Sequence, residues 1–259
     1  MIDSPVVRRV RHELRRRTLT VTQVRPQAAG LLRVVFGGEQ LAGFTSLGFD
    51  DHVKLFFPDG AGGEARRDFT PRRHDAAANE LWIDFHLHDE GPAARWAAGA
   101  TVGQSLDVGG PKGSSIVEPA GIDLHLFVGD ETALPAIARR LEELPATARA
   151  LVVLETASDV QQALSSGNPS LRIVWIAKAR GPADGGVLID VLRGLELPER
   201  CFAWVAHESK VARAIRRHLV DVRGFDPGWV KAAGYWQRGA AGTHDHLADA
   251  DRAMEPATT

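Results

Sequence analysis

The chain has 259 residues, which is enough for one large domain or two of ordinary size. Its 31 Lys and Arg against 33 Asp and Glu give a net charge of −2, which argues against bulk nucleic-acid binding. Apolar residues make up 44% and charged residues 25% of the chain, and no stretch approaches the roughly 18 apolar residues of a membrane-spanning helix. Cys201 is the single cysteine, so an internal disulfide, a cysteine-ligated zinc site and a cysteine-held iron–sulfur cluster within one chain are excluded. If the protein transfers electrons, we expect an organic carrier.

The N-terminus carries six arginines between Arg8 and Arg17. No apolar run follows them before the first predicted strand, so the apolar segment of a secretory signal is missing. We therefore expect a cytoplasmic protein.

The first half of the chain consists of short extended segments separated by Gly, Pro and Asp, a pattern typical of antiparallel strands. Apolar and polar residues alternate most clearly at 81–87, which gives that segment one apolar face. A short helix is expected at 91–99. Strands this short, without helices between most of them, predict a closed six-stranded antiparallel β-barrel. The predicted strands are residues 18–24, 31–36, 52–57, 66–70, 81–87 and 104–108.

From about residue 122, apolar runs alternate with helical patterns, which predicts a Rossmann-like parallel α/β domain after the barrel. Helices are expected at 132–143, 159–164, 187–193 and 208–222. The predicted domains are residues 1–119 and 120–239, followed by a flexible tail at 240–259 that lacks sustained periodicity.

The segment RDFTPRR carries three side chains suited to a cofactor at the rim of a barrel. Arg67 and Phe69 share one face of the predicted strand, and Thr70 lies on the other. An arginine can hold a phosphate, an aromatic ring can lie along an apolar cofactor, and a hydroxyl can bond to a ring nitrogen. The alternative is a basic edge strand that ends at Pro71.

The fifth predicted strand leads into a helix that starts near Gly91. Backbone N–H groups at Gly91 to Ala94 would favour an anion, although an ordinary strand-to-helix turn is the alternative. His86 and His88 share a face and could hold a metal, but spacing fixes no third ligand, so we expect no metal site.

Asp130 and Glu131 directly follow the first strand of the second half, where a doubly wound sheet binds a nucleotide. The segment lacks G-x-G-x-x-G, and the two acids would repel a pyrophosphate, so they suit hydroxyl or amide donors. The alternative is that Asp130 or Thr132 caps the following helix. Glu155, at the end of the next strand, can accept from a ribose 2′-hydroxyl, which favours NADH. Its alternative is a solvated loop carboxylate.

The last predicted strand ends with Tyr235 and Trp236, which point to opposite sides. Aromatic residues at the carboxyl end of a parallel strand lie near the ligand crevice, and core packing is the alternative for one of them.

Seven segments occur together in a recognisable order and spacing across residues 15–239. They are DDHVKLFFP from Asp50, R-x-F-T at 67–70, IDFHLHDEGPAARWA, GGPKGS at 109–114, GDETALPAIARRLEELP, RAIRRHLV and GYWQRG. In this combination the chain resembles the siderophore-interacting proteins, FAD-dependent ferric-siderophore reductases of the ferredoxin-reductase-like superfamily. The resemblance implies an FAD-binding barrel followed by an NAD(P)H-binding domain, with the flavin in the cleft between them.

The resemblance also implies roles for individual residues. No side chain is assigned a catalytic role, because the flavin carries the chemistry. FAD contacts are expected from Arg67, Asp68, Phe69, Thr70, His86, Leu87, His88, Gly91, Pro92, Ala93, Trp96, Gly113 and Ser114. NAD(P)H contacts are expected from Asp130, Glu131, Thr132, Ala133, Glu155, Tyr235 and Trp236. Substrate contacts are expected from Lys54, Lys112 and Arg238.

Three residues depart from the family pattern. Phe69 replaces the usual tyrosine and removes a hydrogen bond worth about 0.5–1.5 kcal/mol, so FAD should bind less tightly. Asp89 stands where the family usually has glycine, which is less favourable if the backbone there needs a positive φ. His207 replaces the glycine of an Ala-Gly-Glu turn, and its side chain could narrow the nicotinamide entrance.

We therefore expect an FAD-dependent oxidoreductase that passes electrons from NADH or NADPH through the flavin to a ferric siderophore and releases Fe(II). The alternatives are a ferric-chelate or flavin carrier without efficient turnover and a general flavin or redox-partner reductase. The sequence leaves open which siderophore is used, which nicotinamide serves, and the role of the arginine-rich start. It leaves the oligomeric state open as well, and a monomer is compatible with it.

Overall fold

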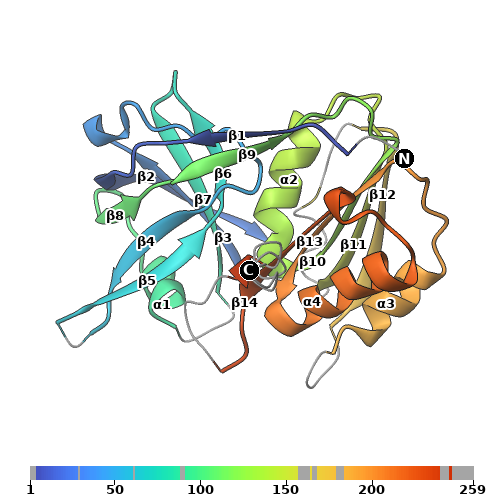
Figure 1. The fold of residues 1–259 in the computed structure, drawn as a ribbon. Helices are drawn as coiled ribbons and strands as arrows, with labels where there is room; N and C mark the ends of the chain where they lie inside the picture. Colours follow the sequence, from blue (N-terminus) through green and yellow to red (C-terminus); the bar gives the residue numbers. More distant parts are fainter. Residues whose placement is uncertain are drawn as a thin grey trace, which may run out of the picture.

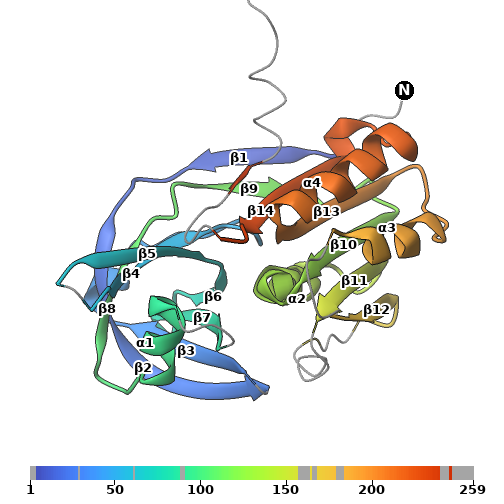
Figure 2. The same ribbon diagram turned by 90° about the horizontal axis from the view of Figure 1, so that it is seen from below.

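The computed structural model describes residues 4–28, 30–60, 62–87, 91–156, 164, 168–178, 184–239 and 245–246. Figures 1 and 2 show an antiparallel sheet on one side of the molecule and a parallel sheet flanked by helices on the other. The strands are β1 Val7–Arg11, β2 Arg16–Ala28, β3 Leu31–Gly37, β4 Val53–Pro58, β5 Glu64–Phe69, β6 Pro71–Asp75, β7 Glu80–His86, β8 Ser105–Gly109, β9 Gly113–Val117, β10 Leu124–Asp130, β11 Ala150–Thr156, β12 Leu171–Ala177, β13 Cys201–Glu208, β14 Val230–Trp236 and β15 Asp245–His246. The helices are η1 Glu39–Leu41, α1 Pro92–Ala98, η2 Glu131–Ala133, α2 Leu134–Glu143, α3 Gly186–Arg193, α4 Ser209–Arg217, η4 His218–Val222 and η5 Pro227–Trp229.

The antiparallel sheet contains all six predicted strands and one more, in the order β5-β4-β8-β2-β3-β7-β6. The prediction of a closed six-stranded barrel is therefore wrong in its strand count. Pro71 does not end the strand that precedes it but begins β6, because a proline without an N–H is tolerated as the first residue of an edge strand. The edge strands β5 and β6 are joined at Thr70, and within the described residues no ladder between them closes the sheet.

The concave side of this sheet is filled by aliphatic and aromatic side chains from every second residue. On β2, for example, Leu19 and Val21 are fully buried while Thr18 is exposed. The predicted helix at 91–99 is present as α1, whose Trp96 packs against Phe57 and Phe85.

The arginine-rich start forms a strand that sequence analysis did not predict. Strand β1 pairs antiparallel with β9, and the two run side by side from the antiparallel sheet towards the α/β half (Figures 1 and 2). A Cβ at Gly113 would lie 2.5 Å from the Val10 carbonyl oxygen, so this close pairing requires glycine there.

The parallel sheet confirms the Rossmann-like prediction, with the order β12-β11-β10-β13-β14 and a short antiparallel β15 at one edge. Helix α2 lies between the two sheets, whereas α3 and α4 lie on the opposite face of the parallel sheet (Figure 2). The predicted helix at 208–222 is split into α4 and a π-helical turn, η4. The predicted helix at 159–164 lies outside the described residues except for Leu164, and the predicted tail lies outside them except for β15.

Cys201 begins β13 and is fully buried in the core between the sheet and helices α3 and α4. Burial raises the pKa of its thiol to about 12. No helix among the described residues is long and apolar enough to cross a membrane.

The two sheets are joined by a buried arginine on α2. The Arg139 guanidinium donates to the Ser46 carbonyl oxygen, the Ser46 hydroxyl and the Pro71 carbonyl oxygen, each at 2.9 Å, while its Nε donates to Glu143 at 2.7 Å. The junction is therefore held by polar bonds between α2 and the loop and strand of the first half. The division of the chain near residue 119 stays a prediction.

An apolar contact accompanies this polar junction. Phe49 belongs to the first half in sequence, yet it packs edge-on against Phe127 and Trp204 in the α/β core. Asp50 beside it accepts from the Trp204 Nε1 at 2.9 Å and from the Lys231 Nζ at 2.7 Å.

We predict that Arg139→Ala destabilises the protein by about 2–4 kcal/mol, because two buried carbonyl oxygens lose their donors. Urea unfolding followed by tryptophan fluorescence measures the change. Arg193→Ala is the matched control, because Arg193 forms an exposed ion pair with Asp190 and such pairs contribute little. Equal effects of the two substitutions would contradict the role assigned to Arg139.

Candidate functional site

Phe69 and Thr70 lie where the antiparallel sheet faces the parallel one. The half-buried Phe69 ring lies 4.6 Å from that of Phe85. Thr70 is buried, and its side chain hydrogen-bonds with that of Tyr235 at the end of β14. This bond places a predicted flavin residue in contact with a predicted nicotinamide residue.

Two further predicted residues of β5 are placed by strand pairing. Asp68 lies opposite Lys54, and the Lys54 Nζ donates to its carboxylate at 2.8 Å. Lys54, predicted to contact the substrate, is therefore paired with a carboxylate. The Arg67 guanidinium donates to the Arg66 carbonyl oxygen, and no carboxylate among the described residues forms an ion pair with it.

The predicted turn lies between the end of β7 at His86 and the start of α1 at Pro92. Leu87 donates its N–H to Gly30 at 2.8 Å, and the half-buried His86 ends β7. Gly91 precedes α1 without a side-chain cap, and a Cβ there would meet no atom within 4 Å, so the space beside this turn is open. His88 and Asp89 lie outside the described residues.

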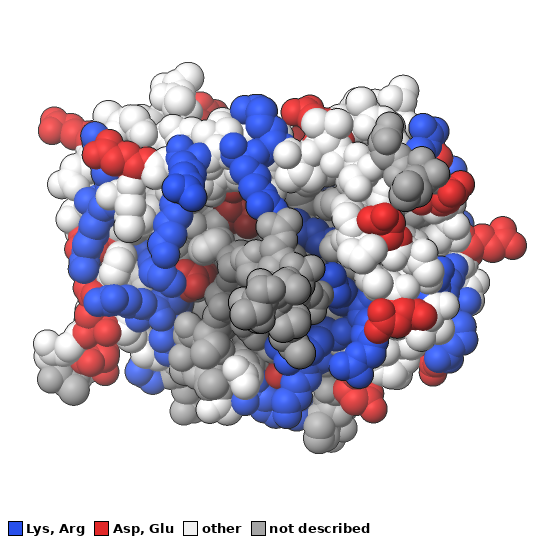
Figure 3. Space-filling view, viewed as in Figure 1, with Lys and Arg blue, Asp and Glu red and all other residues white. Residues whose placement is uncertain are grey.

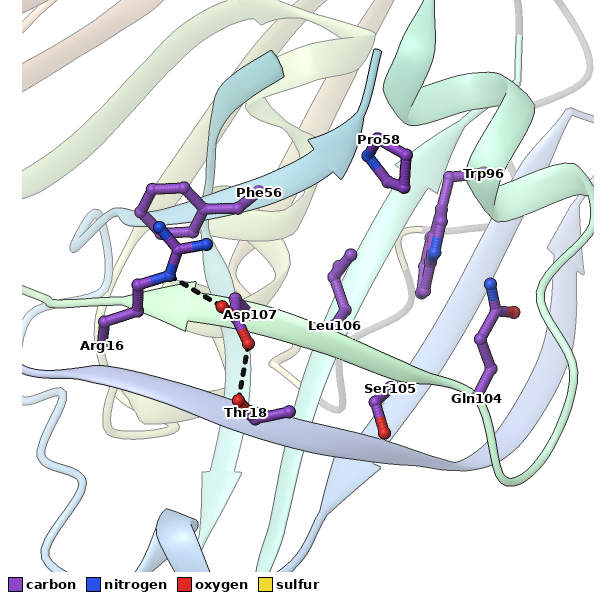
Figure 4. A pocket seen from close by; sticks show the side chains of 9 residues that line it. All are labelled: Arg16, Thr18, Phe56, Pro58, Trp96, Gln104, Ser105, Leu106 and Asp107. Carbon is purple, nitrogen blue, oxygen red and sulfur yellow. Dashed lines mark hydrogen bonds and ion pairs between the residues drawn. The ribbon is translucent and has the colours of Figure 1, made fainter. Parts of the chain in front are cut away.

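Trp96 lines a cavity of about 240 Å³ on the outer side of the antiparallel sheet (Figure 4). On the far side of this cavity, Asp107 accepts from the Arg16 Nε at 2.7 Å and from the Thr18 hydroxyl at 2.6 Å. Trp96 therefore packs within the first half of the molecule, and its contact with FAD stays a prediction.

Ser114 has polar partners that its sequence context did not indicate. Its buried hydroxyl donates to Asp51 at 2.6 Å, accepts from the Leu47 N–H at 3.0 Å and contacts the His12 Nε2 at 2.8 Å. This network anchors the β1–β9 pair, and the contact of Ser114 with FAD stays a prediction.

Asp130 ends β10 at the carboxyl edge of the parallel sheet and is fully buried. It accepts from the Thr132 N–H at 2.9 Å, from the Thr132 hydroxyl at 2.5 Å and from the Trp236 Nε1 at 2.7 Å. Asp130 therefore caps the turn η2, as one of the two interpretations proposed. Burial would raise the pKa of this carboxyl, but the nearby His207 and these hydrogen bonds lower it.

The neighbouring side chains of the same turn are also engaged. Glu131 forms an ion pair with Lys178, which follows β12. Ala133 is fully buried and lies so close to Gly129 that a Cβ at Gly129 would be 2.6 Å from that of Ala133. Glycine is therefore required at position 129, one residue before the end of β10.

Glu155 is the second-last residue of β11, beside Asp130, and is only 5% exposed, so the alternative of a solvated loop carboxylate is wrong. Its Oε2 lies 3.2 Å from the Nε2 of His207, which is 1% exposed. The Nδ1 of the same imidazole lies 3.6 Å from the Asp130 Oδ2. Burial opposes the charged imidazole, but the carboxylates of Asp130 and Glu155 outweigh it and raise the pKa of His207.

Tyr235 and Trp236 cover the edge of the sheet. The Tyr235 ring packs edge-on against Trp204 with centroids 5.9 Å apart, and burial together with Asp50 raises the pKa of its phenol. The Trp236 ring lies 5.9 Å from the Lys178 Nζ. Tyr235 therefore takes part in core packing, and its contact with a nicotinamide stays a prediction.

The other predicted substrate residues, Lys112 and Arg238, are exposed. Sequence analysis did not predict a cavity of about 320 Å³ next to Lys112, whose lining includes Arg11, Arg15, Arg17 and Glu13. Figure 3 shows a further gathering of Lys and Arg over α4, whose exposed face carries Lys210, Arg213 and Arg217.

Comparison with known proteins assigns the family. The family described as "Siderophore-interacting protein" matches residues 122–239, and the "Siderophore-interacting FAD-binding domain" matches residues 20–66 and 63–115. An NADPH-dependent ferric-chelate reductase of Escherichia coli is 36% identical over 250 residues, which cover 88% of this chain and 95% of that protein. The chain belongs to the siderophore-interacting proteins.

Other members of the family are similar in sequence and structure. The ferric vibriobactin reductase ViuB of Vibrio cholerae is 33% identical to this siderophore-interacting protein over 81% of this chain and 84% of that protein. A siderophore utilization protein from T. fusca superposes with a TM-score of 0.84 at 36% identity, covering 93% of this chain and 99% of that one. The siderophore-interacting protein SipS from Aeromonas hydrophila superposes with a TM-score of 0.73 at 28% identity, covering 87% and 93%.

We predict a pH-dependent stability for this siderophore-interacting protein that originates at His207. The pKa of His207 is raised in the fold above its unfolded value of about 6.5, so its stabilisation is complete below that pH and is lost as pH rises through the folded pKa. The melting temperature of the wild type should therefore fall relative to that of His207→Gln as the pH rises above about 6.5. Parallel curves for the two proteins would contradict the raised pKa.

Proposed function

We propose that this protein is an FAD-dependent reductase that passes electrons from NAD(P)H to ferric siderophores and so releases Fe(II). The observation that carries the proposal is the hydrogen bond between Thr70 and Tyr235, because it joins the predicted flavin half of the site to the predicted nicotinamide half. The similarity to the ferric-chelate reductase of Escherichia coli and the ferric vibriobactin reductase of Vibrio cholerae supports a reductase of ferric chelates. Because NAD(P)H is a reductant of the cytoplasm, we propose that the protein acts there.

The residues on the first half of the site are compatible with FAD. The space beside Gly91 is open, the Phe69 ring offers an apolar face, and the Arg67 guanidinium donates to the backbone carbonyl oxygen of Arg66. A guanidinium without a carboxylate partner is suited to a phosphate. We therefore propose that Arg67 and Gly91 hold the FAD phosphates, while Phe69 and Thr70 contact the ring system. The other FAD contacts implied by the resemblance stay proposals as well.

A bound flavin supplies the conversion that this reaction needs, since nicotinamide delivers two electrons as a hydride and each ferric ion accepts one. The protein side chains bind and orient the reactants. We propose that Thr70 exchanges its bond with Tyr235 for one with the ring system. The rings of Tyr235 and Trp204 then exclude water from that side of the site.

An anionic ferric chelate requires positive charge near the point of electron transfer. Lys112 and Arg238 are exposed, and Arg11, Arg15 and Arg17 surround the cavity beside Lys112. We propose that Lys112, Arg238, Arg11 and Arg17 attract the chelate, whereas Asp68 offsets the charge of Lys54 and Glu13 offsets that of Arg15. The attraction should weaken with salt, since charges are screened over about 8 Å at physiological ionic strength.

The direct test is to load the purified protein with FAD and mix it with NADH or NADPH and a ferric siderophore in the presence of a ferrous-specific chelating dye. We expect bleaching of the flavin absorbance and formation of the coloured ferrous complex, with up to two ferrous ions for each nicotinamide oxidised. A protein that cannot be loaded with FAD, or a loaded flavin that neither nicotinamide bleaches, would overturn the proposed function.

A second prediction concerns the Thr70 hydroxyl. Thr70→Ala should weaken FAD binding about 2- to 12-fold, because one hydrogen bond worth about 0.5–1.5 kcal/mol is lost. Thr70→Ser keeps the hydroxyl and should bind FAD like the wild type. Quenching of flavin fluorescence on titration measures both dissociation constants, and equal losses in the two variants would show that the hydroxyl does not contact the cofactor.

A further inference from the structure

His207 is held in one orientation at the carboxyl edge of the parallel sheet. The Glu208 N–H donates to its Nδ1 at 2.7 Å in the neutral imidazole, which places the proton of that form on Nε2, and the charged form carries a proton on Nε2 as well. That nitrogen faces the Glu155 Oε2 at 3.2 Å. The His207 side chain, one residue before the end of β13, therefore reaches past β10 to the Glu155 carboxylate, one residue before the end of β11.

The position of Glu155 is the one from which an acid reads the ribose of a dinucleotide. It lies one residue before the end of β11, the strand that follows β10, η2 and α2 in the chain, and it pairs in register with Asp130 of β10. In doubly wound folds a free carboxylate at this place accepts from a ribose 2′-hydroxyl and repels a 2′-phosphate. In this chain the carboxylate is buried and bonded to an imidazole, so it is not free to do either.

The other charged side chains near His207 and Glu155 also have partners. Asp130 lies 3.6 Å from the other ring nitrogen of His207 and is satisfied by Thr132 and Trp236. Lys178 forms an ion pair with Glu131 at the neighbouring strand end. Each described carboxylate that faces His207 or Lys178 at this edge thus has a partner, and Glu155 depends on His207 for its own.

We propose that His207 withdraws Glu155 from the adenosine ribose and thereby lets the sheet edge accept a 2′-phosphorylated dinucleotide, NADPH. His207 is a positioning residue, because it acts through Glu155 and not on the reacting atoms. The assignment rests on the proposed use of NAD(P)H by this edge of the sheet. It replaces the preference for NADH that an unengaged Glu155 would produce.

The test is equilibrium binding of two adenosine probes by titration calorimetry, which needs neither flavin nor turnover. One probe is adenosine 2′,5′-bisphosphate, which carries the 2′-phosphate, and the other is ADP, which lacks it. His207→Ala should weaken binding of the bisphosphate about tenfold, because a like charge is released towards the 2′-phosphate, while binding of ADP changes less than about twofold.

Two further variants separate this role from simple loss of packing. His207→Gln can still donate an N–H to Glu155 and should bind both probes within about twofold of the wild type. In the double variant His207→Ala with Glu155→Gln the released charge is absent, so affinity for the bisphosphate should return. Thermal melts confirm that each variant is folded.

Several outcomes would overturn the inference. They are a wild type that binds neither probe, equal losses for the two probes in His207→Ala, and a double variant that does not recover. Failure of the proposed function is seen separately, as a flavin that neither NADH nor NADPH bleaches in the wild type. In the active enzyme His207→Ala should raise the KM for NADPH relative to the KM for NADH.

Discussion

The geometry of the candidate site depends on one buried guanidinium. Arg139 stands on α2, a helix of the parallel half, yet it donates to Ser46 and Pro71 of the antiparallel half. A buried charge is retained only where its donors are satisfied, so these bonds fix the distance between the two sheets. The contact of Thr70 with Tyr235 follows from that distance, because Thr70 directly precedes Pro71 in the chain. The arrangement of the candidate site therefore depends on hydrogen bonds that lie between the two sheets.

Much of the fold could be predicted from the sequence, because the period of apolar residues differs between strands and helices. The six strands predicted in the first half and the parallel orientation of the strands in the second half follow from that period. Strand β6 was missed because Pro71 was interpreted as the end of a strand. Strands β1 and β9 were missed because their pairing joins segments about a hundred residues apart, and no local pattern in an arginine-rich segment reports a distant partner.

The candidate site was predictable in its residue types and less so in its partners. Motif spacing correctly brought Asp130, Glu155 and Trp236 to one edge of the sheet. The sequence could not show that Glu155 is buried against His207, since such a pair depends on register between strands that are far apart in the chain. For the same reason it did not show that Asp68 offsets the charge of Lys54. Motifs locate functional groups, whereas tertiary packing decides which of them are free.

The state of the single cysteine has a consequence for work with iron. A thiol reacts with oxidants and binds metals as the thiolate, and the pKa of about 12 keeps Cys201 protonated at neutral pH. Ferrous iron and oxygen together generate peroxide, which converts exposed thiolates to sulfenic acid and mixed disulfides. Because its sole sulfhydryl is buried between the parallel sheet and helices α3 and α4, the chain is protected from oxidation of that thiol and from cross-linking to its neighbours through it.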